Sequence, residues 1–87
     1  MNTIELMRDR LALMQVEHLD IEDESAQHAG HTGAKSGGGH YRLHIVSAAF
    51  NGKTTLARHR MVYDALGELM HHHIHALSIT AHTPEEL

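Results

Sequence analysis

Residues 54–81 read TTLARHRMVYDALGELMHHHIHALSITA, a stretch in which the hydrophobic period changes once. Apolar residues recur at helical spacing through its first part, with Val62 and Leu66 on one side. This spacing predicts a single amphipathic helix from about Thr54 to Met70. It is the longest regular pattern in the chain, so the fold must be built around it.

The second part of the stretch, residues 74–81, alternates with the two-residue period of a β-strand. His75 shares strand parity with Leu77 and Ile79. This parity predicts that the His75 ring lies beside the apolar face, at the first residues of the strand.

The remaining sequence contains four shorter patterns. They predict a helix at residues 3–14, a strand around residues 18–22, a strand at residues 40–47 and a last helix that begins at Thr83 and Pro84. Asn2 can cap the first helix with Glu5 three positions on. Residues 24–39 hold five of the seven glycines, a composition that predicts a long loop and therefore a long-looped hairpin. Phe50 and Gly52 fall in the connection after the second strand.

The order helix, strand, strand, helix, strand, helix predicts one α+β domain over residues 1–87. A three-stranded sheet with the helices on one face, a sandwich of two layers, buries these apolar faces most economically. A chain of 87 residues can bury a modest hydrophobic core without disulfide bonds.

Composition restricts the chemistry that the chain can do. It has no cysteine, which excludes disulfides, thiolate nucleophiles and any metal site with sulfur ligands from cysteines of its own. Neither Ser25 nor Ser47 lies in a recognisable nucleophile motif, so we expect no enzyme. The first residues do not show a basic region followed by an apolar run, and no run of 18 apolar residues occurs, so we expect a cytoplasmic protein that contacts no membrane.

The charge of the chain is unevenly distributed. The formal net charge is -4, yet four basic residues and no acidic one lie between positions 42 and 60. They are Arg42, Lys53, Arg58 and Arg60. One face could therefore be locally positive and contact phosphates or a protein partner.

Histidine is the most unusual residue of this chain, with eleven copies. Imidazole is a common metal ligand, and its charge changes near neutral pH. Three of these residues, His71 to His73, stand together at the end of the long helical pattern, where the helix dipole favours imidazolium charge. Three others, His28, His31 and His40, lie in or beside the glycine-rich segment.

Several motifs, taken in order, resemble the BolA family over almost the whole chain. They are Asp23-Glu24-Ser25 followed by His28, Tyr41-Arg42-Leu43, then Ser47, Phe50 and Gly52, the run from Arg58 to Tyr63, His75-Ala76-Leu77-Ser78, and Thr83 to Leu87. The resemblance implies an α+β fold similar to a class II KH domain. The segment Gly30-His31-Thr32-Gly33 is not the GXXG clamp of such domains, because it joins two strands rather than two helices.

The resemblance also implies two functions. The first is partnership with a monothiol glutaredoxin, in which both proteins and glutathione hold a 2Fe-2S cluster for iron-sulfur trafficking or for iron and redox sensing. His75 matches the usual cluster ligand of the family, and His28 best matches the second ligand, with His31 and His40 as rivals. The second function is that of a DNA-binding transcriptional regulator of stress response and cell morphology.

We adopt the glutaredoxin adaptor as the leading hypothesis and double-stranded DNA binding through the surface from Arg42 to Arg60 as its alternative. The isolated chain, expected to be a monomer or weak homodimer, should hold no cofactor, because one loop imidazole and His75 do not complete a four-ligand site. The sulfur ligands must then come from a partner.

Overall fold

The computed structural model describes residues 2–25 and 39–87. Its helices are α1 (Thr3–Leu11), α2 (Thr55–Leu66) and α3 (Leu69–His72), and its strands are β1 (Val16–Asp23), β2 (Gly39–Ser47) and β3 (Ile74–His82). Short 3₁₀ turns follow α1, β2 and β3 at η1 (Ala12–Met14), η4 (Ala48–Phe50) and η5 (Pro84–Glu86). Residues 26–38, which make up most of the predicted glycine-rich loop, lie outside the described residues.

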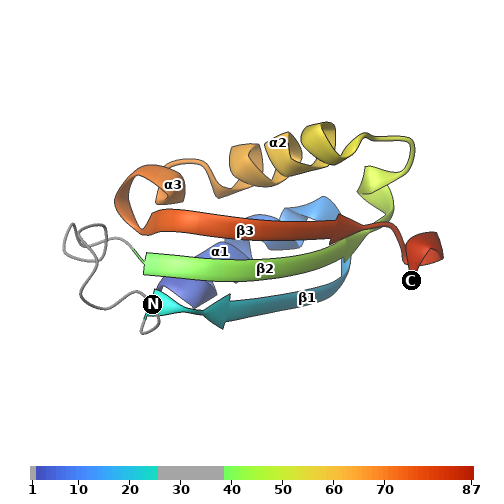
Figure 1. Cartoon of the computed structure of the whole chain (residues 1–87). Coiled ribbons are helices and arrows are strands. Elements are labelled where there is room, and N and C mark those ends of the chain that lie inside the picture. The colour runs from blue at the N-terminus through green and yellow to red at the C-terminus, as the bar shows by residue number, and fades with distance from the viewer. Residues whose placement is uncertain (1, 26–38) are drawn as a thin grey trace.

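The three strands form one mixed sheet in the order β1-β2-β3 (Figure 1). β1 and β2 run antiparallel, with Ile21 opposite Leu43, which confirms the predicted strand pair. β3 lies parallel to β2, with Leu43 opposite Ile79. A parallel neighbour requires a long crossover connection, and α2 and α3 supply it.

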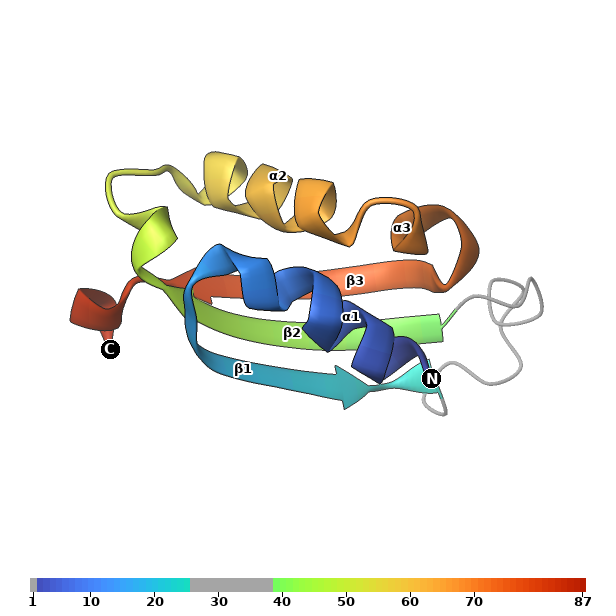
Figure 2. The same ribbon diagram turned by 180° about the vertical axis from the view of Figure 1, so that it is seen from behind.

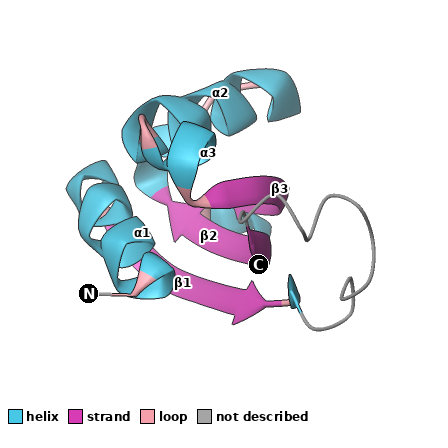
Figure 3. Ribbon diagram, turned by 90° about the vertical axis from the view of Figure 1, so that its left-hand side faces the viewer, coloured by secondary structure: helices cyan, strands magenta, loops and turns pink. Residues whose placement is uncertain are grey.

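The helices lie on one face of this sheet, so the predicted two-layer α+β sandwich is confirmed (Figures 2 and 3). The apolar side chains between the two layers form the core. Its buried members are Met7, Leu11, Ile21, Tyr41, Leu43, Ile45, Phe50, Val62, Leu66, Leu69 and Ile74. Within residues 2–25 and 39–87, no helix lies over the opposite face of the sheet, which is seen from the front in Figure 1.

The start of α1 is capped as its sequence predicts. The side chain of Asn2 accepts a hydrogen bond from the backbone N–H of Glu5 at 2.9 Å. The cap satisfies one of the four N–H groups that a helix leaves without a partner at its first turn. Met7 and Leu11 then point into the core and are fully buried.

The long helix predicted from Thr54 to Met70 is interrupted, which corrects the prediction. α2 ends at Leu66, and the next residue, Gly67, has a φ of 55°, a value that L side chains rarely adopt. The carbonyl of Leu66 accepts a hydrogen bond of 3.4 Å from the Arg10 guanidinium of α1. The chain then forms the separate short helix α3, in which Leu69 is again buried.

The connection after β2 is part of the core, although its sequence predicted only a link. The buried Ser47 hydroxyl donates to the carbonyl of Met14 and accepts from the N–H of Ala49. This pair of bonds fixes the turn η4, which carries Phe50 into the core with no exposed surface.

Candidate functional site

Two imidazoles meet at one end of the sheet, where β2 and β3 begin. The ring centroids of His40 and His75 lie 5.1 Å apart, with their planes at 50°. His75 is exposed, and His40 is half-buried. The sequence singled out both residues separately, and the fold brings them together.

His75 does not occupy the face that its parity predicts. The ladder between β2 and β3 shifts register at this point, because Gly39 is opposite Ile74 while His40 is opposite Ala76. The shift leaves His75 with no partner on β2, so Ile74 takes the core side and is buried. An extra residue of this kind turns the side chains of a strand locally. The prediction that His75 lies beside the apolar face is therefore wrong.

The motif Asp23-Glu24-Ser25 holds the backbone of His40 from both sides. The N–H of His40 donates to the Ser25 hydroxyl at 3.1 Å, and its carbonyl accepts from the N–H of Glu24 at 2.7 Å. Asp23 in turn accepts from the N–H of Ser25 at 2.9 Å. Hydrogen bonds from the Ser25 side chain and backbone lower the pKa of Asp23 below its usual value. These bonds connect the end of β1 and the two residues that follow it to the start of β2, and they fix the backbone of His40.

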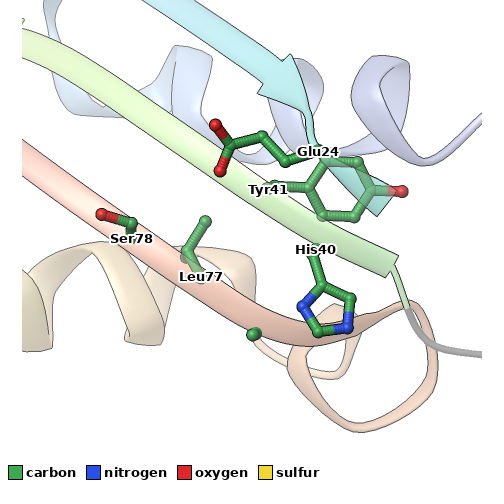
Figure 4. Close-up of a pocket in the computed structure, with 6 residues that line it drawn as sticks. Glu24, His40, Tyr41, Leu77 and Ser78 are labelled. Atoms are coloured by element: carbon green, nitrogen blue, oxygen red, sulfur yellow. The ribbon is translucent and has the colours of Figure 1, made fainter. Parts of the chain in front are cut away.

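A cavity of about 200 Å³ opens beside the His40 side chain (Figure 4). β2, β3 and the residue that follows β1 contribute to its lining, which consists of Glu24, His40, Tyr41, Ala76, Leu77 and Ser78. The Tyr41 ring covers Gly39 so closely that a Cβ atom there would lie 2.6 Å from it. Glycine at position 39 thus lets Tyr41 line the cavity, a close approach that the sequence did not indicate.

The other predicted loop ligands cannot be placed against His75, because His28 and His31 lie outside the described residues. The histidine triplet occupies the end of α3, where His73 is the C-cap. The carbonyl of His73 accepts from the N–H of Gly39 at 3.1 Å, which ties the end of this helix to the start of β2. The predicted place of the triplet at a helix end is therefore confirmed.

The basic surface predicted from Arg42 to Arg60 is partly neutralised by the fold. Arg42 forms ion pairs with Glu24 at 2.8 Å and with Glu22 at 3.7 Å. Lys53 and Arg60 are exposed and have no ion-pair partner within residues 2–25 and 39–87. Although residues 42–60 contain no acidic residue, acidic residues from other parts of the chain compensate part of their positive charge.

Arg58 is the most completely bonded of the four basic residues. Its guanidinium donates to both carboxylate oxygens of Glu86, at 2.7 and 3.0 Å, and to the carbonyls of Lys53 and Ala81. Glu86 also accepts from the N–H of Thr83 and completes a capping box for η5. The hydrogen bonds from Arg58 and Thr83 lower the pKa of Glu86 to about 2, from an ordinary value of 4.5.

We expect this carboxylate to make folding sensitive to acid. A group whose pKa is lower in the folded state contributes stability above its unfolded pKa, and the contribution is lost as pH falls toward the folded pKa. Urea unfolding between pH 5.5 and 2.5 should therefore show the stability advantage of the wild type over Glu86→Gln shrinking as pH falls. In Arg58→Gln, NMR titration should place the Glu86 pKa closer to 4.5. An unchanged Glu86 titration in Arg58→Gln would contradict the assignment.

The fold and the site together define a small α+β domain that carries one exposed and one half-buried imidazole side by side at one end of an uncovered sheet face. A family model described as BolA-like protein matches residues 11–86. The chain therefore belongs to the BolA-like protein family.

The relatives of this chain include plant and bacterial proteins. A protein of Arabidopsis thaliana named SufE-like protein 1, chloroplastic/mitochondrial, is 46% identical over 74 residues, which cover 79% of this chain and 20% of the relative. A protein of Haemophilus influenzae named DNA-binding transcriptional regulator BolA is 40% identical over 72 residues, which cover 83% of this chain and 67% of the relative. The chain spans only a fifth of the first of these relatives.

A solved structure of BolA1 from Arabidopsis thaliana has the same fold. It superposes with a TM-score of 0.85 at 38% identity, over 100% of this chain and 98% of that one. No helix within residues 2–25 and 39–87 is long and apolar enough to cross a membrane. One relative is named as chloroplastic and mitochondrial, and another comes from a bacterium. A cytoplasmic location for this chain therefore stays a prediction.

Proposed function

We propose that this chain is a non-enzymatic adaptor that docks a monothiol glutaredoxin and supplies two imidazole ligands to a bridging 2Fe-2S cluster. The observation that carries the proposal is the meeting of His40 and His75 on an accessible end of the sheet, with 5.1 Å between their ring centroids. The resemblance described above implies the same class of partner.

The two imidazoles fit one iron of such a cluster. Each iron takes two ligands besides the bridging sulfides, and in Rieske-type centres two histidines hold one of the irons. Two imidazoles bound to one tetrahedral ion, with bonds of roughly 2.0 to 2.1 Å, place their ring centroids roughly 5.2 Å apart. The separation of 5.1 Å between the His40 and His75 rings agrees with that estimate.

The absence of cysteine determines what the partner must supply. This chain can offer nitrogen ligands only, so the thiolates for the second iron would come from the glutaredoxin and from glutathione. When bound, the cluster supplies one-electron redox chemistry. This chain holds His40 beside His75, because the hydrogen bonds from Glu24 and Ser25 fix the backbone of His40.

The test is anaerobic reconstitution of the full chain with a monothiol glutaredoxin, iron, sulfide and glutathione. We expect visible absorption and circular dichroism that differ from those of the glutaredoxin alone, and we expect His75→Ala to abolish this difference. His72→Ala is the matched control, because His72 is exposed nearby in sequence but lies on α3. A His75→Ala complex with the wild-type spectrum would contradict the ligand assignment.

Binding to double-stranded DNA is the second candidate function, favoured by the printed name of the Haemophilus influenzae relative and by the exposed Lys53 and Arg60. A labelled duplex titrated at several salt concentrations tests it. When basic side chains neutralise phosphates, the logarithm of the binding constant falls linearly with the logarithm of the salt concentration. Absence of binding near about 0.1 M salt would count against this function.

A further inference from the structure

We propose that His44 and His82 form a second metal site, on the uncovered face of the sheet, which binds a divalent ion of the zinc and copper type. The Nε2 atom of His44 and the Nδ1 atom of His82 lie 3.1 Å apart. The ring centroids are 5.3 Å apart, with the ring planes at 89°. The proposed function uses neither residue.

The two residues come from adjacent strands and share one face. On β2, His44 alternates with the buried Leu43 and Ile45, so its side chain lies on the face opposite the core. On β3, His82 is opposite Val46, which belongs to the same uncovered face. The strand pairing therefore sets the spacing of the two imidazoles.

The side chains of His44 and His82 are partly buried on this face of the sheet. Val46 is only 1% exposed, although its parity on β2 places it on the face opposite Leu43 and Ile45, away from the helices (Figure 3). Its ladder neighbours are His18 on β1 and His82 on β3. The ring of His18 in turn lies 5.5 Å from that of His44. Three imidazoles thus surround one buried valine, and this packing limits how far the ligand pair can reorient.

The spacing of the two nitrogen atoms suits a bound ion. Bonds of roughly 2.0 to 2.1 Å at a tetrahedral angle place the two donor atoms about 3.3 Å apart. The observed 3.1 Å needs an adjustment of only a few tenths of an ångström. Imidazole suits zinc, copper and nickel, whereas calcium and magnesium prefer oxygen.

Binding requires one change of tautomer. The contact of 3.1 Å is a hydrogen bond when one of the two nitrogen atoms carries a proton. An ion needs a lone pair on both atoms, so the proton must sit on Nδ1 of His44 and on Nε2 of His82. Both are neutral forms of imidazole, and no ring has to turn over.

The charges around the pair favour a cation. Asp20, which is opposite His44 on β1, supplies the negative charge. Glu86 lines a cavity together with His82, but its carboxylate is already paired with Arg58. Arg42 lies on the same face, but its charge is compensated by Glu22 and Glu24. No group of three or more potential ligands is assembled within the described residues, so water or a rotated His18 would complete the coordination.

The pair is separate from the site at His40 and His75. His40 and His44 are four residues apart on one strand, which corresponds to about 13 Å. One ion cannot bridge that distance. A bound ion would instead link β2 to β3 near the C-terminal end of β3, and a ligand that binds only the folded state stabilises it.

The test is titration of the full chain with zinc chloride, without any partner. The starting variant carries His71→Gln, His72→Gln and His73→Gln, which removes the triplet as a competing site. Imidazole ¹⁵N resonances identify the ligands, while calorimetry gives the affinity and a thermal melt gives the stabilisation. We expect zinc to shift the resonances of His44 and His82 and to raise the melting temperature.

Adding His44→Gln or His82→Gln should each lower the zinc affinity at least tenfold, since changes one shell further out already cost roughly 10- to 100-fold. Adding His75→Ala should leave the His44 and His82 shifts in place, which separates this proposal from the cluster function. Zinc binding that is indifferent to both glutamine substitutions, or that shifts only other histidines, overturns the proposal. Both residues are partly exposed, so these variants should fold.

Discussion

Replacing Phe50 with alanine is expected to lower the free energy of unfolding by about 3 to 5 kcal/mol, the usual cost of removing a buried phenylalanine. Phe50 is the only phenylalanine in the chain and has no exposed surface. The core around it is aliphatic and otherwise has one aromatic ring, that of Tyr41. A domain of this kind has only about 5 to 15 kcal/mol of total stability, so the variant should be close to the limit of folding.

Urea unfolding followed by far-ultraviolet circular dichroism measures this loss. Leu56→Ala is the matched control, because Leu56 is 62% exposed on α2 and its truncation should cost less than about 0.5 kcal/mol. Leucine and alanine are both strong helix formers, so a change in helix propensity contributes little to the measured effect of Leu56→Ala. If Phe50→Ala costs no more than Leu56→Ala, the turn η4 does not anchor the core as described.

Phe50 also marks the limit of what the sequence predicts about the fold. The alternation in the strand predicted at residues 40–47 puts Tyr41, Leu43 and Ile45 on one face, and all three are buried, because side-chain parity within one strand is a local property. An isolated aromatic residue in a turn has no such periodicity. The helical spacing of apolar residues continues past Gly67 and so did not reveal that the helix ends at Leu66. Leu69 is buried in the separate helix α3, as it would be in one continuous helix.

The site was predictable residue by residue but not as an arrangement. Resemblance identified His75 and offered His40 among the loop candidates, yet the register shift that exposes His75 depends on the pairing of β3 with β2. The ion pairs of Arg42 and Arg58 likewise join separate elements. A count of charges along the sequence cannot detect them, and it therefore overestimated the basic surface.

The second large effect concerns the imidazole that accompanies His75 in the proposed cluster. We expect His40→Ala to weaken cluster binding in the glutaredoxin complex at least tenfold, as His75→Ala should. The reason is that the His40 ring already lies 5.1 Å from that of His75 and its backbone is bonded on both sides. Such prior positioning removes part of the entropic cost of binding. We expect His28→Ala and His31→Ala to retain the cluster.

Loss of the cluster alone would not distinguish a ligand from a residue that merely shapes the site. Labelling only this chain with ¹⁵N-histidine and measuring nitrogen hyperfine couplings on the reduced cluster makes the distinction. The wild type should show two coupled nitrogen atoms, and any cluster retained in His40→Ala should show one. Two couplings in His40→Ala together with one in His28→Ala would instead assign the second ligand to His28, the first choice from the sequence. The two imidazoles at the sheet end would then be neighbours without sharing an iron.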